Sequence, residues 1–206
     1  MGYAPPMELD ALLRTPTSTL AEVQSLLDPL DHAARYSAFR GCGTVELGRL
    51  YEIADPNIDG AHFVGDRGPL EPVAHDGWNS LPLPAFARTF QKVFCRPEAG
   101  GAERIFGYNE GSLRFFIGPG YFQLVPTAGN AEFEARGAWV VDYHKVPDSA
   151  VPPKWPWVVK NWVGPQILVY NGTRDFMRKV NDTVSVGKPW GFAGAMPFCF
   201  ILVRRA

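Results

Sequence analysis

Short strands rich in aromatic residues fill the second half of the chain, and this pattern constrains the fold more than any other feature. Gly and Pro interrupt residues 102–205 at regular intervals. Many short strands separated by turn residues are typical of an antiparallel barrel or sandwich. The predicted strands span residues 103–108, 112–117, 121–126, 137–146, 165–170, 182–186 and 198–204.

These strands predict a mainly β fold, a lipocalin-like antiparallel β-barrel with an N-terminal helix and one or two short helices. The 206 residues suit one domain. We expect a helical segment over residues 1–30 and the barrel over residues 36–206. Thr19 and Glu22 have the spacing of a capping box, which begins a helix.

Residues between these regions give weaker patterns. Alternation of polar and apolar side chains predicts two strands within residues 39–53 and a short strand at 61–65. Residues 66–84, with four prolines, predict a loop. Helical spacing of apolar residues predicts short helices at 84–93 and 173–180. The proline-rich residues 147–156 predict an extended crossover.

Composition narrows the classes of partner. The net charge is −1 and the basic residues are dispersed, so we expect binding neither to nucleic acid nor to an anionic membrane, both of which need a basic face. No apolar run is long enough for a membrane span. The first residues do not resemble a signal peptide, and three widely spaced cysteines suit a reducing compartment, so we expect a cytoplasmic location.

No sequence motif points to a metal or cofactor. The four histidines, at 32, 62, 75 and 144, lack the close pairing typical of zinc ligands. The chain also lacks the glycine-rich nucleotide motifs and the nucleophile elbow of α/β-hydrolases. We therefore expect neither a metal nor a cofactor, although residues distant in sequence can still form a catalytic triad.

The strongest polar constellation is Asp142 with His144, on the predicted strand 137–146. Alternation places both on one face and Trp139 and Tyr143 on the other. If the polar face points inward, an acid and a base meet in an apolar cavity, where desolvation raises the pKa of the carboxyl group. The aromatic face is the better candidate for the core, and Trp139 and Tyr143 are then buried.

Two further polar clusters are candidates for function. Tyr108 and Glu110 form a second catalytic candidate, although residues 109–111 also suit a turn between two strands. Asp175 and Lys179 have the spacing of an ordinary ion pair on the solvated face of a helix. Aromatic side chains can line a ligand cavity or simply fill the core. The aromatic ligand-binding candidates are Phe115, Tyr121, Trp139, Tyr143, Trp162 and Tyr170.

Both ends of the chain carry a family resemblance. Residues 13–28 precede the segment Phe39-Arg40-Gly41-Cys42-Gly43, and residues 169–172 lead into 175–183, Gly187-Lys188 and 197–200. This ordering resembles proteins with a GXWXG domain followed by a DUF4334 domain, although Arg40-Gly41-Cys42-Gly43 lacks the Trp of that motif. The resemblance implies a lipocalin-like fold and assigns no catalytic residue.

Three functional hypotheses follow. The first is binding of a small hydrophobic molecule in a barrel cavity. The second is a cofactor-independent isomerase or cyclase acting on a terpenoid or polyketide-like substrate in the same cavity, and the third is haem binding through one histidine. The polar groups that point into the cavity distinguish them. A cavity without polar groups favours a carrier, an inward acid–base pair favours an enzyme, and an open histidine favours haem. The sequence leaves the ligand and the oligomeric state open.

Overall fold

The fold begins with a series of short helices. The computed structural model describes residues 8–98 and 104–205. Within them, α1 (Leu9–Arg14), α2 (Leu20–Leu27), α3 (His32–Ala38), η1 (Phe39–Gly41), α4 (Thr44–Ile53) and α5 (Ala61–Val64) come first. The predicted capping box is confirmed: Thr19 Oγ1 accepts from the Glu22 N–H, and the Glu22 carboxylate accepts from the Thr19 N–H.

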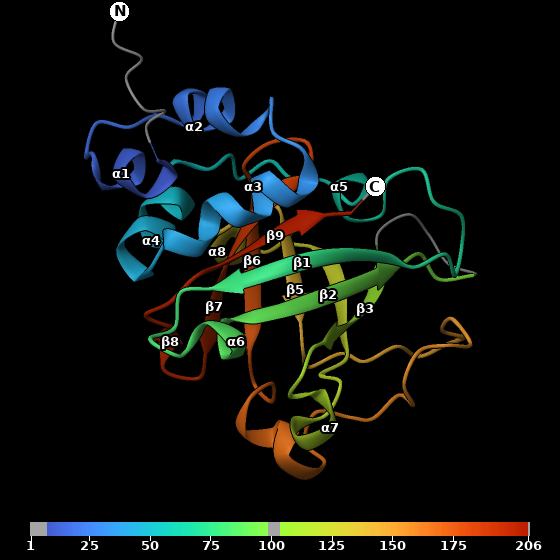
Figure 1. Ribbon diagram of the computed structural model, residues 1–206. Helices are drawn as coiled ribbons and strands as arrows, with labels where there is room; N and C mark the ends of the chain where they lie inside the picture. The colour runs from blue at the N-terminus through green and yellow to red at the C-terminus, as the bar shows by residue number, and fades with distance from the viewer. Residues whose placement is uncertain (1–7, 99–103, 206) are drawn as a thin grey trace, which may run out of the picture.

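Antiparallel strands then form a closed barrel (Figure 1). The strands are β1 (Val73–Asn79), β2 (Thr89–Cys95), β3 (Ile105–Glu110), β4 (Phe122–Pro126), β5 (Trp139–Asp142), β6 (Arg174–Lys179), β7 (Val184–Gly191), β8 (Gly194–Ala195) and β9 (Phe200–Arg204). Eight of them pair in the order β1-β2-β3-β4-β5-β6-β7-β9, and β9 pairs back to β1. The short β8 extends β7 as a hairpin. The predicted lipocalin-like fold class, mainly β with a few short helices, is confirmed.

Both faces of the barrel wall are covered over much of its surface. One buried cluster, which includes Phe94, Phe122 and Leu202, fills one half of the interior, where Phe63 and Val64 of α5 plug the end. A second cluster joins α1, α2 and α4 to the outer faces of β1, β7 and β9. A third cluster lies outside β2 and β3, where the long crossover between β5 and β6 covers them through Trp155.

Short helical segments connect several strands. They are α6 (Ala85–Arg88), α7 (Arg114–Ile117), α8 (Ala131–Glu134) and η2 (Gly164–Leu168). The segments α7 and η2 contact each other at the end of the barrel opposite α1 and α2 (Figure 1). Within residues 8–98 and 104–205, no helix is both long and apolar enough to cross a membrane.

Several strand predictions are wrong because helices form there. Residues 44–53 form α4, which buries Leu47, Leu50 and Tyr51 at helical spacing. The signal for this helix is Glu46, whose carboxylate accepts from the Gly43 N–H at 2.8 Å as a helix start requires. Residues 61–64, 114–117 and 164–168 are also short helices and not strands. The first barrel strand therefore begins at Val73 and not near residue 36.

Three other segments form strands where the sequence predicted a helix or a loop. Residues 89–93 of the predicted helix 84–93 belong to β2, although residues 85–88 form the short helix α6 as predicted. Residues 174–179 within the predicted helix 173–180 form β6, and the predicted loop 66–84 contains β1. In β6, Phe176 and Met177 are both buried although they point to opposite faces. A strand with both faces covered loses the alternation that identifies it, and its apolar residues then match helical spacing by chance.

Candidate functional site

A cavity opens into the half of the barrel that the interior cluster leaves unfilled. Its volume is about 370 Å³, which lies at the lower end of the range for small-molecule sites. Most of its wall is apolar, and the wall residues come from the strands and from the short helices at the barrel end. The apolar lining includes Leu81, Leu83, Ala87, Phe90, Leu113, Ile117, Val169, Pro189, Met196, Phe198 and Phe200.

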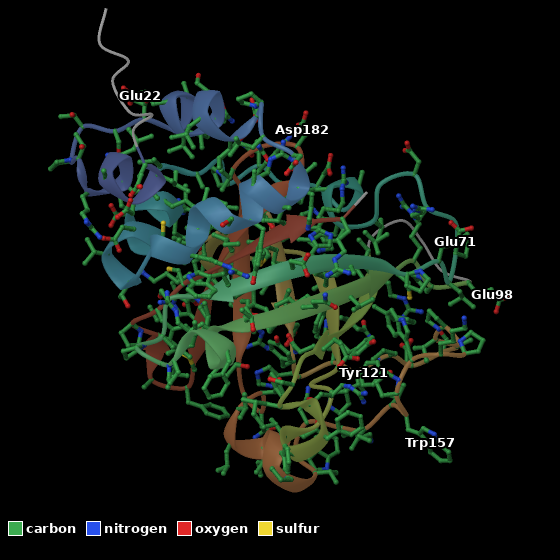
Figure 2. The ribbon with its side chains drawn as sticks, in the orientation of Figure 1. Glu22, Glu71, Glu98, Tyr121, Trp157 and Asp182 are labelled. Atoms are coloured by element: carbon green, nitrogen blue, oxygen red, sulfur yellow. The ribbon has the colours of Figure 1, made fainter. Side chains whose placement is uncertain are left out.

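Five buried polar side chains also line this cavity, and four of them contact one another: Lys92, Asn109, Tyr143 and Asp175. The fifth, Thr173, donates instead to the Tyr170 carbonyl oxygen. We call the four that contact one another the polar quartet. Strand pairing brings them together, because Lys92 of β2 lies directly opposite Asn109 of β3. On the other side of the barrel, Asp175 of β6 pairs with Val141 of β5, and Tyr143 follows two residues later on the same face. The four groups therefore come from strands that are far apart in sequence (Figure 2 shows the side chains on the barrel).

Lys92 is the centre of the quartet. Its ammonium group donates to Asn109 Oδ1 at 2.9 Å, to Asp175 Oδ2 at 3.1 Å and to the Tyr143 hydroxyl oxygen. These three acceptors use all three hydrogens of the ammonium. Asn109 Nδ2 in turn donates to Tyr143 Oη at 3.2 Å and to the Gly120 carbonyl oxygen at 2.9 Å. The quartet is thus one connected hydrogen-bond network.

Burial shifts the acid–base properties of these groups. It lowers the pKa of Lys92 from its usual value and raises the pKa of Asp175, while the attraction between the two charges opposes both shifts. Burial also raises the pKa of Tyr143 well above its usual value, so this phenol is neutral at pH 7. The pKa values of the ammonium and the carboxyl group therefore lie closer together than in water, which favours proton movement within the site.

Asp175 keeps capacity for a further hydrogen bond. Lys92 donates to its carboxylate, and a hydrogen bond from Tyr143 also lowers its pKa. Among residues 8–98 and 104–205, no other group donates to this carboxylate. An ionised carboxylate has about four acceptor positions. Asp175 can therefore accept a proton from a bound molecule, and Tyr143 can present its hydroxyl group beside it.

Three of the residues proposed from the sequence line the cavity: Tyr143, Tyr170 and Glu110. The ring of Tyr170 stacks on that of Tyr143, with 5.2 Å between the ring centres. Glu110 lies at the rim, where its carboxylate pairs with Arg114 at 2.7 Å. The expected burial of Trp139 and Tyr143 on one face is confirmed, since both are buried in the barrel interior.

Asp142 and His144 do not form the acid–base pair of the cavity. Asp142 lies on the outer face of β5, where its carboxylate is 3.3 Å from Arg174 and accepts from the backbone N–H of His144. The His144 side chain is exposed. The alternative in which these residues face inward is therefore wrong, because alternation gives the interior to Val141 and Tyr143.

The remaining aromatic candidates lie outside the cavity. Tyr108 and Tyr121 pack with Trp155 on the outside of the barrel, because β3 turns Asn109 inward and Tyr108 outward. Trp139 belongs to the filled half of the interior. Phe115 and Trp162 are exposed. None of the five aromatic candidates Tyr108, Tyr121, Trp139, Phe115 and Trp162 contacts the cavity.

Sequence reasoning missed Lys92, Asn109 and Asp175. One signal was available for Lys92, because it stands between Phe90 and Phe94 on one face of an apolar segment. A lysine on the buried face of a strand needs a partner and is a candidate for function. Asp175 gave no such signal, since its true partner is Lys92 across the barrel and not Lys179.

Metal and haem sites need particular side chains close together. In the described ranges, no three His, Cys, Asp or Glu side chains gather closely enough to hold a metal ion. No histidine is among the described residues that line the cavity. His75 is inside the barrel but in its filled half, where its ring stacks on Phe63 and meets Phe94 edge to face. The geometry therefore does not favour the haem hypothesis.

Comparison of the chain with protein-family models, with curated proteins and with solved structures found no match.

Proposed function

We propose that the chain binds a small, mainly apolar carbonyl compound in the barrel cavity and acts on it as a cofactor-independent isomerase. The observation that carries this proposal is the polar quartet at the inner end of a mainly apolar cavity. Apolar walls stabilise a bound molecule by removing its surface from water, and the few polar groups orient it.

The quartet favours an enzyme over a simple carrier. A buried ion pair rarely stabilises a fold more than apolar residues of the same volume would, because desolvation of the two charges offsets their attraction. Lys92 and Asp175 are nevertheless almost fully buried, with side-chain exposures of 2% and 6%. Ionisable groups with pKa values shifted by burial, placed in a cavity, are typical of catalytic sites.

The groups suit proton transfer next to a carbonyl group. In the first step Asp175 removes a proton from the carbon beside the carbonyl, and the electron pair moves to the carbonyl oxygen to form an enolate. Tyr143 donates a hydrogen bond to that oxygen, and the charge of Lys92 stabilises the negative charge through Tyr143. In a substrate with a C=C bond next to the deprotonated carbon, the enolate is a dienolate, and in the second step Asp175 returns the proton to its far carbon. The electron pair moves back from the oxygen, the C=O bond re-forms, and the C=C bond moves next to it. The product is an isomer of the substrate, and no external reagent is consumed.

Binding can be tested with the uncharged fluorescent dye N-phenyl-1-naphthylamine. We expect one saturable site in the folded protein. Val169→Trp should weaken binding, because the larger side chain narrows the mouth of the cavity. Val45→Trp is the matched control, since Val45 is exposed on α4, away from the cavity. A dye that binds only to the exposed surface would bind more tightly to Val169→Trp, and such a result would refute cavity binding.

Proton transfer can be tested by the exchange of deuterium into the CH₂ group beside the carbonyl of 1-tetralone, followed by NMR in D₂O. The wild type should accelerate exchange over buffer, and Asp175→Asn and Tyr143→Phe should each lose most of this acceleration. Asp142→Asn is the matched control, because Asp142 is a buried aspartate outside the cavity. Saturable dye binding without any acceleration of exchange would leave a carrier and refute the isomerase.

A further inference from the structure

Large apolar side chains are exposed at the end of the barrel where the cavity opens. Of the fourteen large apolar side chains that are exposed in the described residues, thirteen fall within residues 83–86, 113–116 and 157–169 or at Phe192. Only Val45 lies elsewhere. We call these four segments the apolar collar. Exposed apolar residues are ordinary when scattered, whereas their concentration on one part of the surface marks an interaction site.

The collar surrounds the mouth of the cavity. Each of its segments, or the residues next to it, contributes to the lining: Ala87 beside Phe86, Ile117 beside Phe116, and Val169 beside Leu168. Phe192 lies in the turn between β7 and β8, whose neighbours Pro189 and Met196 also line the cavity. The same short elements therefore turn one side toward the cavity and the other toward solvent.

The longest collar segment lies in a part of the chain with a small local positive charge, although the basic residues of the whole chain are dispersed. Residues 149–170 contain Lys154 and Lys160 and no Asp or Glu. Both lysines are exposed, and no carboxylate within the described part of the chain forms an ion pair with either. At the other end of the molecule, the carboxylates of Asp28, Asp55 and Asp182 line a polar cleft with one lysine, Lys179, which pairs with Asp182. Figure 2 shows Trp157 projecting from one end and Asp182 near the other.

We propose that the apolar collar docks on the surface of a lipid bilayer that contains anionic lipids, with the cavity mouth facing the headgroups. Trp and Phe side chains prefer the membrane interface, where an apolar ring meets polar headgroups. Lysines beside them are attracted to anionic lipids, and the carboxylates at the other end are repelled, so the two charges orient the protein.

The shape of the collar favours a bilayer over a protein partner. Trp157 and Leu168 project from opposite ends of the segment 157–169 with exposures of 91% and 88%. Phe115 and Phe192, which are 84% and 86% exposed, stand on two other collar segments around the opening. A soft interface accepts such separate anchors without a complementary rigid surface. The opening that they surround leads to an apolar cavity, so an apolar molecule can pass between bilayer and cavity with little exposure to water.

Vesicle binding tests the proposal. The full chain should co-sediment with phosphatidylcholine vesicles that contain phosphatidylglycerol, and roughly tenfold less with phosphatidylcholine alone. Brominated lipids in the anionic vesicles should quench tryptophan fluorescence, and Trp157→Phe should reduce that quenching.

Two pairs of variants separate the collar from general effects. Trp157→Ser/Leu168→Ser should weaken vesicle binding roughly tenfold or more, whereas Val45→Ser should not. Lys154→Glu/Lys160→Glu should abolish the preference for anionic vesicles, whereas Lys179→Glu, near Asp182, should keep it. All these positions are exposed or at the surface, and unchanged melting temperatures would show that the fold is intact.

Three results would overturn the proposal. One is an absence of binding to anionic vesicles, and another is equal weakening by the collar variants and their controls. The third is a dimer in sedimentation velocity that Trp157→Ser/Leu168→Ser dissolves, because a second copy of the chain would then cover the collar. Docking does not depend on the proposed isomerase, and Asp175→Asn should bind vesicles as the wild type does.

Discussion

Replacement of Lys92 by Met tests whether the buried pair holds the site together. Met fills a similar volume but leaves the Asp175 carboxylate, which is 6% exposed, without its positive partner. Breaking a buried pair in this way costs about 3–5 kcal/mol of unfolding free energy. For a chain of this size, such a loss lowers the melting temperature by roughly 6–20 °C.

The loss should depend on pH with a defined sign. Burial raises the pKa of Asp175, and removal of Lys92 takes away the attraction that opposes this shift. Between its unfolded pKa and its raised folded pKa, the folded state then binds more protons than the unfolded state. The loss of stability in Lys92→Met relative to the wild type should therefore shrink as the pH falls from 7 toward the unfolded pKa of Asp, about 4.

Urea denaturation followed by circular dichroism measures these changes. The double variant Lys92→Met/Asp175→Leu should recover most of the loss, because an apolar pair replaces the ion pair without leaving a charge. Lys179→Met is the control: Lys179 pairs with Asp182 at 2.8 Å, closer than the buried pair, yet Asp182 is 92% exposed. The free energy of unfolding of Lys179→Met should stay within about 1 kcal/mol of the wild-type value.

Two outcomes would refute this reasoning. If Lys92→Met is as stable as the wild type at pH 7, the carboxylate does not need its partner. If the double variant is no more stable than Lys92→Met, the two residues are not energetically coupled.

Three further predictions concern the rest of the fold. Trp139→Ala should cost about 3–5 kcal/mol in urea denaturation, whereas the exposed Trp157→Ala should cost almost nothing; a near-wild-type melting temperature for Trp139→Ala would contradict its burial in the barrel interior. Burial lowers the pKa of His75 to about 3, so the unfolded state binds more protons than the folded state below pH 6.5. The free energy of unfolding should therefore fall by up to about 1.4 kcal/mol per pH unit as the pH drops. His75→Leu should reduce this dependence on pH. A Cβ at Gly107 would lie 2.4 Å from the ring of Phe122, so Gly107→Ala should destabilise by roughly 1–3 kcal/mol, and unchanged denaturation would show that the ring moves freely.

The site and the collar assign different tasks to one end of the barrel. The polar quartet provides the chemistry at the inner end of the cavity, and the apolar collar surrounds its mouth. A collar variant that loses vesicle binding should still exchange deuterium into 1-tetralone in solution. An Asp175→Asn variant should show the reverse behaviour, so the two proposals can be tested independently.

The amino-acid sequence alone determined the fold class and some local features. Regular turn residues between short aromatic strands indicated an antiparallel barrel, and Thr19 with Glu22 indicated the start of α2. Alternation along residues 139–143 indicated which face of β5 lines the barrel interior. These features depend on neighbours within a few residues, so a local pattern is sufficient to predict them.

Tertiary structure decided the rest. Strands β2 and β6 were assigned to the wrong class, because layers from distant parts of the chain cover both faces of the strands and remove their alternation. Helix α4 was also assigned wrongly, although Glu46 is a local signal for its start. The polar quartet was missed because its members lie on different strands. Lys92 and Asp175 are 83 residues apart, and only closure of the barrel brings their charges to 3.1 Å. A contact between distant strands depends on register and closure, and neither can be read from the residues on one strand.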